Sequence, residues 1–404
     1  MLPLLAALRR APLMPNLIVL QVAVACAILC NTLFLLGQQA GPLLVDDGLA
    51  RDQLVIVDQL VSRGAPWTPE RIRAGRDALA AIPGVRNASA VTGAPMRQTL
   101  TMTYELKAAN GTLLVASGYM GEGLLDTFGL RLSRGRDFLA TEYRDIDMQD
   151  DLHLPIIITE ALARALFDGA DPIGAMLRPG DGAGSYTVVG VVEHLMRYQL
   201  SELDDGKAEY AVLLPGQLTG MPLASYVLRT DPQRRDAVRT QIPDILERTF
   251  AGQLVPGIKP VVADYEQLRS EGLRTRRAAV WLLATVNTVI AAITLVGIAS
   301  LSGYWIQQRT RQIGIRRALG ATRHQILRHF LLENLLLVGA GLLLGLLLAV
   351  AINQWLMRHY ELARLPLYYP PLAAGALLLL GQLAVAAPAR RAARLAPASA
   401  TRSV

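Results

Sequence analysis

The chain has 404 residues, of which 52% are hydrophobic, 5% aromatic and 18% charged. This length accommodates one soluble domain and several membrane spans. The formal net charge is +7, and segments 1–16, 309–333 and 388–404 carry 12 arginines and one glutamate, whereas the rest of the chain is net acidic. Basic residues gathered beside apolar stretches follow the positive-inside rule, so the charge distribution argues against a nucleic-acid partner.

The first apolar stretch, residues 17–37, has about the length that a helix needs to cross a bilayer. A cleaved signal peptide is the alternative, but its apolar region would be shorter, roughly 7–15 residues, and no small-x-small cleavage site follows. We therefore predict a retained transmembrane helix. It holds the only two cysteines, Cys26 and Cys30. We interpret them as small residues of a lipid-facing helix rather than as a ligand pair.

Residues 38–277 have the mixed pattern of a soluble α/β domain. Thr68 and Pro69 predict the start of a helix that runs to about residue 82. Strands are predicted at 99–106 and 112–119, with Asn110-Gly111 as a hairpin turn between them. Further strands are predicted at 154–158, 186–192 and 210–214, and further helices at 160–167 and 231–250. Because this segment lacks cysteine, the domain must fold on its core alone, and it is large enough to do so.

Three more apolar stretches predict the second, third and fourth transmembrane helices at 278–305, 334–357 and 367–388. Between them lie a basic loop, 306–333, and a short loop, 358–366, and a basic tail, 389–404, follows. Arginines in segment 1–16, in loop 306–333 and in the tail predict that all three are cytoplasmic. Arg274, Arg276 and Arg277 lie on the opposite side, but long domains translocate largely regardless of such charges.

The sequence thus predicts an α-helical membrane protein with four transmembrane helices and a large mixed α/β extracytoplasmic domain between the first and second helix. The four predicted spans contain no ionisable side chain, and such side chains usually mark a substrate or ion path. Gly341 and Gly345 form a small-x-x-x-small pair that suits close helix packing. We therefore expect the helices to carry motion rather than cargo.

Motifs for catalysis are absent from the sequence, so we expect no enzyme activity and no catalytic, cofactor or metal site on this chain. There is no G-x-x-x-x-G-K-[ST], no H-E-x-x-H and no G-x-S-x-G. The predicted outer domain has two histidines, His153 and His194, and a membrane-embedded enzyme that uses one of them is a weaker alternative. The acidic run from Glu142 to Asp151 lacks the glycine and the closing glutamate of a calcium loop, so we interpret it as a solvated loop.

The basic loop is the most informative segment. Residues 307–319 are compatible with a helix, and Gly320 stands where a helix ends in the left-handed conformation. Thr322 and Gln325 have the spacing of a capping box, which predicts a new helix that runs directly into the third span. A short helix held at a fixed angle against a membrane helix can transmit force. The alternative is an arginine-rich surface helix that only anchors the topology.

The run R-T-R-Q-I-G-I-R-R-A-L-G-A at 309–321 resembles the hallmark loop of FtsX-like permeases, especially those of MacB-type ABC transporters. The C-terminal run 388–397 is similar to the end of that family. Four segments resemble its periplasmic core domain: 135–138, 161–167, 171–174 and 186–192. The resemblance implies a bacterial inner-membrane permease subunit of an ATP-driven transporter that exports peptide, drug, toxin or lipoprotein-like cargo.

The resemblance also implies the partners. ATP would bind to a P-loop ATPase subunit that docks under the loop, and the chain would pair with a second copy or a related permease. A periplasmic adaptor and an outer-membrane channel often accompany such permeases. The implied ATPase-coupling residues are Gln312, Ile313, Gly314, Ile315, Arg316, Arg317, Leu319 and Gly320, with Thr322 and Gln325 as the helix cap.

Two features depart from the family. Gln312 stands where relatives usually carry glutamate, which puts an ion pair from this position in doubt. MacB itself is fused to its ATPase, whereas this chain starts at the first span, so we expect the ATPase on another polypeptide. The alternative function is a non-transporting FtsX-like relay that regulates a cell-envelope enzyme or senses an antibiotic.

Overall fold

The computed structural model describes residues 13–97, 99–147, 153–180, 184–198, 207–310, 312–313, 315, 319–360, 366 and 368–393. It forms two compact units. The helical unit comprises residues 1–40 and 277–404, and the β unit comprises residues 41–276.

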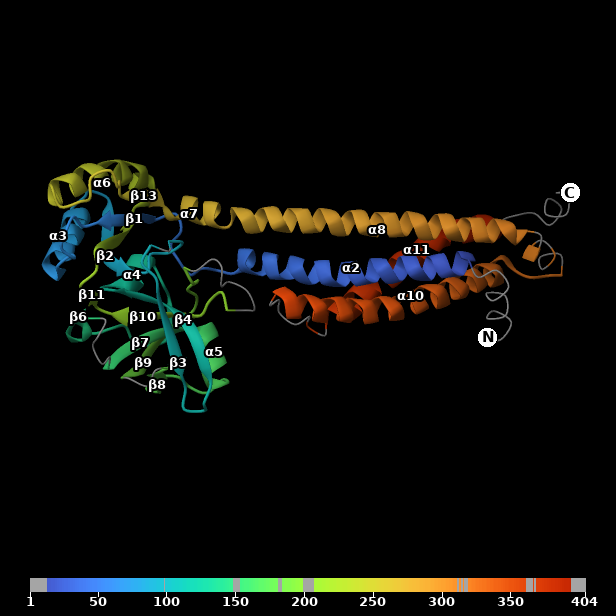
Figure 1. Cartoon of the computed structure of the whole chain (residues 1–404), viewed down its shortest axis with the longest axis horizontal. Helices are drawn as coiled ribbons and strands as arrows, with labels where there is room; N and C mark the ends of the chain where they lie inside the picture. The colour runs from blue at the N-terminus through green and yellow to red at the C-terminus, as the bar shows by residue number, and fades with distance from the viewer. Residues whose placement is uncertain are drawn as a thin grey trace. The chain divides into compact units, whose positions relative to one another are not determined.

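The helical unit contains four helices that are long and apolar enough to cross a membrane (Figure 1). They are α2 (Leu13–Leu44), α8 (Arg274–Gln308), α10 (Arg323–Tyr360) and α11 (Tyr369–Ala393). The first three extend beyond the predicted spans at both ends, because hydropathy marks only the apolar part of a helix. Helix α10 is continuous from the basic loop through the third apolar stretch, as the capping pattern predicts.

Helices α2 and α10 pack closely at small residues. A Cβ atom added at Gly341 would lie 2.7 Å from Val22 Cβ, and one added at Gly345 would lie 2.5 Å from Cys26 Cβ. Cys26 and Cys30 are both 0% exposed. The prediction that they face lipid is therefore wrong: Gly345 on α10 leaves room for Cys26 inside the helical unit, and the Cys30 sulfur lies 3.9 Å from that of Cys26.

Polar side chains within this unit bond across helices. Thr32 Oγ1 donates to Asn287 Oδ1 at 2.8 Å and joins α2 to α8. Asn31 Nδ2 donates to the carbonyl oxygen of Ala349 at 3.3 Å, and Asn334 Nδ2 to that of Gly381 at 3.1 Å. These bonds pair polar side chains of the helical unit with acceptors on neighbouring helices and fix how the helices face one another.

One half of the β unit is a closed ring of six strands. The order is β4–β3–β8–β9–β7–β10, and β10 pairs with β4 to close it. Pairs β7–β9 and β10–β4 are parallel, and the other four are antiparallel. The strands are β3 (Met102–Lys107), β4 (Leu113–Gly121), β7 (His153–Thr159), β8 (Met176–Pro179), β9 (Ser185–Val192) and β10 (Ala211–Pro215). Closure leaves these strands without free edges along the ring.

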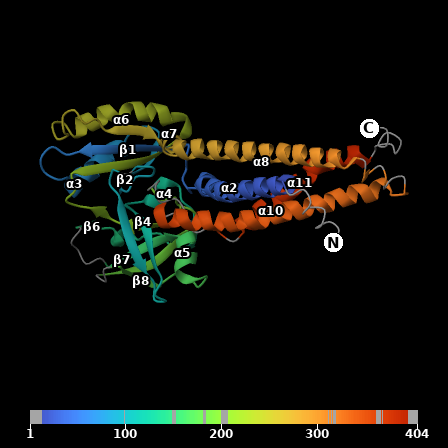
Figure 2. The ribbon, with the colours of Figure 1, turned by 45° about the vertical axis from the view of Figure 1, so that its right-hand side comes forward.

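The second half is a layered sheet that continues from β4 in the order β2–β12–β1–β13. Helices α3 (Pro69–Ala80) and α6 (Arg235–Thr249) cover one face, where they share a core with these strands (Figures 1 and 2). The strands are β1 (Leu54–Val61), β2 (Val85–Thr92), β12 (Leu223–Thr230) and β13 (Val261–Asp264).

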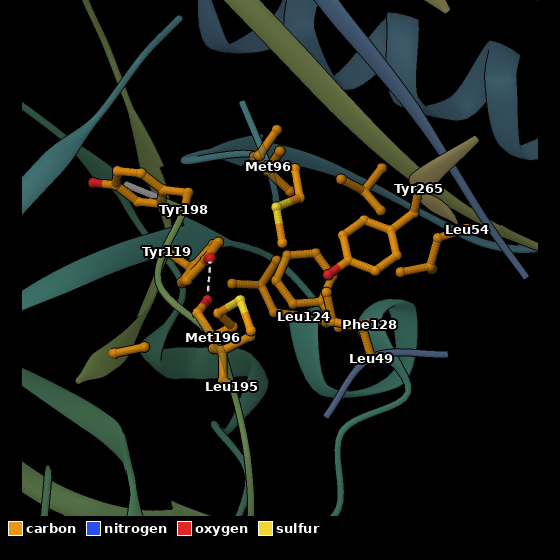
Figure 3. Packing of buried hydrophobic residues seen from close by; sticks show 14 of the residues in the cluster. Leu49, Leu54, Met96, Tyr119, Leu124, Phe128, Leu195, Met196, Tyr198 and Tyr265 are labelled. Atoms are coloured by element: carbon orange, nitrogen blue, oxygen red, sulfur yellow. Dashed lines mark hydrogen bonds between the residues drawn. The ribbon is translucent and has the colours of Figure 1, made fainter. Parts of the chain in front are cut away.

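The opposite face packs on α4 (Leu124–Phe128) and α7 (Tyr265–Gly272). Figure 3 shows the aromatic centre of this core, where Tyr119 donates to the carbonyl oxygen of Met196 at 2.6 Å. Shorter elements complete the unit: β5 (Leu132–Gly135) pairs with β9, α5 (Glu160–Phe167) follows β7, and β6 (Asp145–Ile146) pairs with β11 (Gln217–Leu218).

Local signals in the sequence correspond to observed elements. Thr68 caps α3 by accepting from the N–H of Arg71 at 3.4 Å. The predicted hairpin is β3–β4, where Lys107 pairs with Leu113 across the turn. Helix α5 has the predicted bounds.

Candidate coupling site

The chain between α8 and α10 ends with defined backbone geometry. Gly320 has φ +95° and no atom within 4 Å of an added Cβ, so only its left-handed backbone constrains it. The N–H of Thr322 donates to Gln325 Oε1 at 3.0 Å, and the N–H of Gln325 donates to Thr322 Oγ1 at 3.2 Å. Both hydrogen bonds of the predicted capping box are present, so α10 starts at a fixed point directly after the loop.

Part of the loop is anchored to the helical unit by an apolar side chain. Ile313 is buried and belongs to the same apolar cluster as Ile326 and Phe330 on α10. Its N–H donates to the carbonyl oxygen of Arg309 at 3.0 Å, which is a helical bond. Gln312 beside it is exposed. One turn of the loop is thus packed against α10.

The remaining predicted coupling residues differ in what they offer a partner. Ile315 and Leu319 are exposed, Leu319 by 83%. Gly314, Arg316 and Arg317 lie outside the described residues. Exposed apolar side chains suit contact with another protein surface.

A cavity of about 180 Å³ lies between the loop and the first turns of α10. Ile313, Ile326 and Phe330 form apolar walls, and Arg309 and Gln312 are polar lining residues. The structure therefore brings Gln312, Ile313 and the cap residue Gln325 to one place.

Sequence reasoning missed the charged centre of this region, which is Glu333 on α10. Its side chain is 3% exposed and that of Arg309 is 17% exposed. Arg309 Nη1 donates to Glu333 Oε1 at 3.0 Å, and Trp305 Nε1 donates to the same oxygen at 3.2 Å. The guanidinium carbon of Arg309 lies 4.0 Å from the Trp305 ring centroid. One signal was available: Glu333 is the single acid among the arginines of loop 306–333.

The Arg309–Glu333 ion pair bears on Gln312, which stands where the resemblance expects glutamate. Arg309 finds its carboxylate on α10, so its ion pair does not depend on an acid at position 312. Gln312 lines the neighbouring cavity.

A second buried carboxylate, Asp47, lies in the β unit, three residues after the end of α2. Arg51 Nε donates to both Asp47 oxygens at 2.9 and 3.0 Å, and the Tyr265 hydroxyl donates at 2.8 Å. Arg269 Nε lies 2.9 Å from Asp47 Oδ2. Burial, followed by the negative charge of Asp47, raises the pKa of Tyr265 well above its usual value, so this hydroxyl remains a donor.

The described residues do not assemble a catalytic centre around either histidine. His153 Nδ1 lies 2.7 Å from Ser185 Oγ, and His194 Nδ1 lies 2.6 Å from Glu209 Oε1. These are two separate pairs, and neither joins a nucleophile, a histidine and an acid within the part of the chain that is described.

The acidic run 142–151 also has other partners. Arg136 donates to both oxygens of Glu142 at 2.7 and 2.8 Å, and Arg73 pairs with Asp145 at 3.0 Å. Within the described residues, no group of three or more His, Cys, Asp or Glu side chains is placed to hold a metal.

Comparisons with known families match both units. Residues 284–397 match the family described as FtsX-like permease C-terminal, and residues 18–245 match the family described as MacB-like periplasmic core domain. The second match alone covers more than half of the chain.

Similar curated proteins are ATP-binding/permease proteins. The macrolide export ATP-binding/permease protein MacB of Hahella chejuensis is 24% identical over 351 residues, which are 83% of this chain and 50% of that protein. MacB of Neisseria meningitidis serogroup A is 26% identical over 63% of this chain and 37% of that protein. The pyoverdine export ATP-binding/permease protein PvdT of Pseudomonas syringae pv. tomato is 30% identical over 42% of this chain and 26% of its own. The chain spans half or less of the length of these relatives.

Two solved structures are also similar. The periplasmic region of MacB from Actinobacillus actinomycetemcomitans has 12% identity and a TM-score of 0.37, over 57% of this chain and 97% of that chain. The extracellular domain of the noncanonic ABC-type transporter YknZ from Gram-positive bacteria has 13% identity and a TM-score of 0.35, over 52% of this chain and 99% of that chain. On the two family matches, the chain belongs to the FtsX-like permeases of MacB-type ABC transporters and carries a MacB-like periplasmic core domain.

Proposed function

We propose that this chain is the permease part of an ATP-driven MacB-type exporter and that it passes the motion of an ATPase to the periplasmic core domain. The observation that carries the proposal is the capped junction between the loop and α10. Helix α10 has 38 residues, which is about 57 Å at the usual rise. A partner that displaces the loop therefore displaces one end of a rod longer than the hydrocarbon core of a membrane.

The orientation follows from the arginines. Loop 306–333 and tail 389–404 are the most basic segments, which supports a cytoplasmic loop and cytoplasmic termini, with the core domain on the periplasmic side. ATP binds to the ATPase in this proposal, at its P-loop, and the chain itself needs no cofactor. The exposed Ile315 and Leu319 are suited to contact the ATPase.

The helical unit is better suited to carry motion than cargo. Thr32, Asn31 and Asn334 direct their polar groups to other helices of the unit. The charged pair Arg309–Glu333 lies at the loop end. We propose that the core domain acts on cargo that is already outside the cytoplasm, of the peptide, drug, toxin or lipoprotein type. The names of the relatives, macrolide and pyoverdine exporters, support small-molecule cargo as one case.

Assembly is part of the proposal. Four helices per chain support a dimer, either of two copies or with a related permease. A periplasmic adaptor and an outer-membrane channel would complete an export route across the envelope.

The test is purification of the full chain in mild detergent, followed by reconstitution with whatever ATPase accompanies it. We expect a P-loop ATPase to copurify and its hydrolysis rate to rise when the permease is present. Gly320→Val should abolish that stimulation, because a β-branched residue is strained at φ +95°. A chain that binds no ATPase would contradict the proposal. An export assay with and without the chain then separates transport from the relay alternative.

A further inference from the structure

Three side chains join the two ends of the coupling loop and are here called the clasp: Trp305 and Glu333, which are buried, and Arg309, which is 17% exposed. Trp305 lies in the last turn of α8, Arg309 directly follows the last residue of this helix, and Glu333 lies ten residues after the start of α10. Glu333 is the one acidic residue in the sequences of α2, α8, α10 and α11. The clasp therefore bridges 24 residues of sequence at a single carboxylate.

A carboxylate buried to this degree is stable as an ion only when a cation and hydrogen-bond donors satisfy it. The guanidinium of Arg309 supplies the charge, and the indole N–H of Trp305 supplies a second donor to the same oxygen. The indole ring also covers the guanidinium, at 4.0 Å. Each of the three side chains thus contacts the other two, which fixes the end of α8 against α10.

An arginine that only anchors topology would behave differently. Its charge would lie with the lipid head groups and water, as expected for Arg323 and Arg328, which are both exposed. Arg309 instead directs its charge to a side chain on α10. Its position favours a role in joining helices over a role in membrane orientation.

We propose that the clasp is a positioning element that makes α8 and α10 move together when the loop is displaced, an inference that rests on the proposed function. Among the described residues, the loop otherwise holds α10 through Ile313 and the capped junction after Gly320, and attachments at one end of a helix alone permit a pivot. Glu333 adds an attachment eleven residues beyond Thr322, about 16 Å along the helix. With two separated attachments, displacement of the loop shifts α10 as a whole instead of rotating it about its first turn.

The experiment uses the full chain with its ATPase in lipid nanodiscs. Spin labels at Leu113→Cys in the β unit and Leu372→Cys on α11, both exposed positions, report the distance between the units, with Cys26 and Cys30 replaced by alanine. Distances are compared without nucleotide and with ATP plus vanadate. ATP hydrolysis is measured on the same samples, because a merely structural defect would lower both readouts.

We expect Glu333→Gln to keep ATP hydrolysis within twofold of the parent while the nucleotide-dependent distance change falls at least fivefold. Arg309→Gln should do the same. Arg358→Gln is the matched control, since it removes an exposed guanidinium from the other end of α10, and it should keep both readouts. A full distance change in Glu333→Gln would overturn the proposal.

A second variant guards against a folding failure. Trp305→Phe keeps the ion pair and an aromatic ring but removes the N–H donor, and it should reduce the distance change two- to threefold at normal hydrolysis. An unchanged distance in that variant would equally overturn the proposal. If the parent chain neither stimulates the ATPase nor moves, the proposed function itself fails, which is a different result from loss of movement in the variants alone.

Discussion

The two units each bury a carboxylate, and the two are held in different ways. Asp47 in the β unit is fully buried and faces Arg51 four residues further along the chain and Tyr265 and Arg269 on α7. Glu333 in the helical unit has one arginine and one indole N–H. Removing one partner of Asp47 leaves others in place, whereas each partner of Glu333 is without a substitute among the described residues.

The positions of the two carboxylates in the chain indicate why their partners differ. Asp47 follows α2 by three residues, and Arg269 precedes α8 by five, so their contact holds the two points where the chain enters and leaves the β unit. Glu333 holds the loop end of α8 and α10 instead. We infer that Asp47 mainly stabilises a fold, whereas Glu333 mainly relays displacement.

The largest expected effect is that of Asp47→Asn on the stability of the β unit. Loss of the carboxylate leaves two guanidinium groups without their buried counter-charge, at a cost of about 3–5 kcal/mol in the free energy of unfolding. Denaturant unfolding followed by the fluorescence of Trp67, the one tryptophan of this unit, measures it. Asp46→Asn is the control: Asp46 is exposed and 3.7 Å from Arg51, so its loss should cost less than about 1 kcal/mol. Equal losses of stability in the two variants would show that the buried Asp47 contributes no more than the exposed Asp46.

Gly48→Ala tests whether the segment after Asp47 is rigid. Gly48 has φ +72°, and an added Cβ would lie 2.0 Å from the carbonyl oxygen of His194. Backbone strain and this clash together predict a loss of about 2–4 kcal/mol. Gly64→Ala shares the left-handed backbone but meets no atom within 4 Å, so it should cost only about 1 kcal/mol. Similar losses of stability in both variants would show that the segment after Asp47 shifts to accommodate the added Cβ atom.

Glu333→Gln should destabilise the chain less than Asp47→Asn, by about 1–3 kcal/mol, because the neutral amide loses the ion pair with Arg309 but its oxygen still accepts a hydrogen bond from Trp305. Thermal unfolding of the full chain in detergent compares the two variants. A larger loss for Glu333→Gln would assign the clasp a mainly structural role and reverse the comparison.

The smallest expected effect concerns the exposed pair Arg136–Glu142. The hydrogen bond from Arg136 lowers the pKa of Glu142, so the stabilisation is present above the unfolded-state pKa and is lost as the pH falls through the lower folded-state pKa. The side chain of Arg136 is 44% exposed, so screening keeps the contribution below about 1 kcal/mol. Glu142→Gln should therefore lower stability slightly at neutral pH and not at all in strong acid, as measured by unfolding at both pH values.

Local chemistry in the sequence predicted several features. The cap at Thr68, the left-handed Gly320 and the Thr322–Gln325 box each depend on a few adjacent residues. Strands β1 and β12 were missed because they are buried by helices on both faces and so lack the alternation that marks a strand. The ring closure by β10 and β4 was missed because residues 94 positions apart pair there, for example Ala211 with Ser117.

The coupling site was also predicted only in part, because the contact that was missed joins residues far apart in the sequence. The loop residues and the cap follow from local spacing, but the partner of Arg309 lies 24 residues away on another helix. The sequence drew attention to Gln312, where the resemblance expects an acid, whereas the acid that pairs with Arg309 is Glu333, which was predicted to be the last residue of the basic loop.

The central claim is that the helical unit passes motion without opening a polar path, and its two native cysteines test it most directly. Cys26 and Cys30 are the only cysteines, and both are fully buried within this unit. In sealed proteoliposomes with the ATPase, we predict that a small hydrophilic thiol reagent leaves both unmodified, with and without ATP, during a time that fully labels Leu113→Cys. ATP-dependent modification of Cys26 or Cys30 would contradict the account, because it would show water entering the unit during the transport cycle.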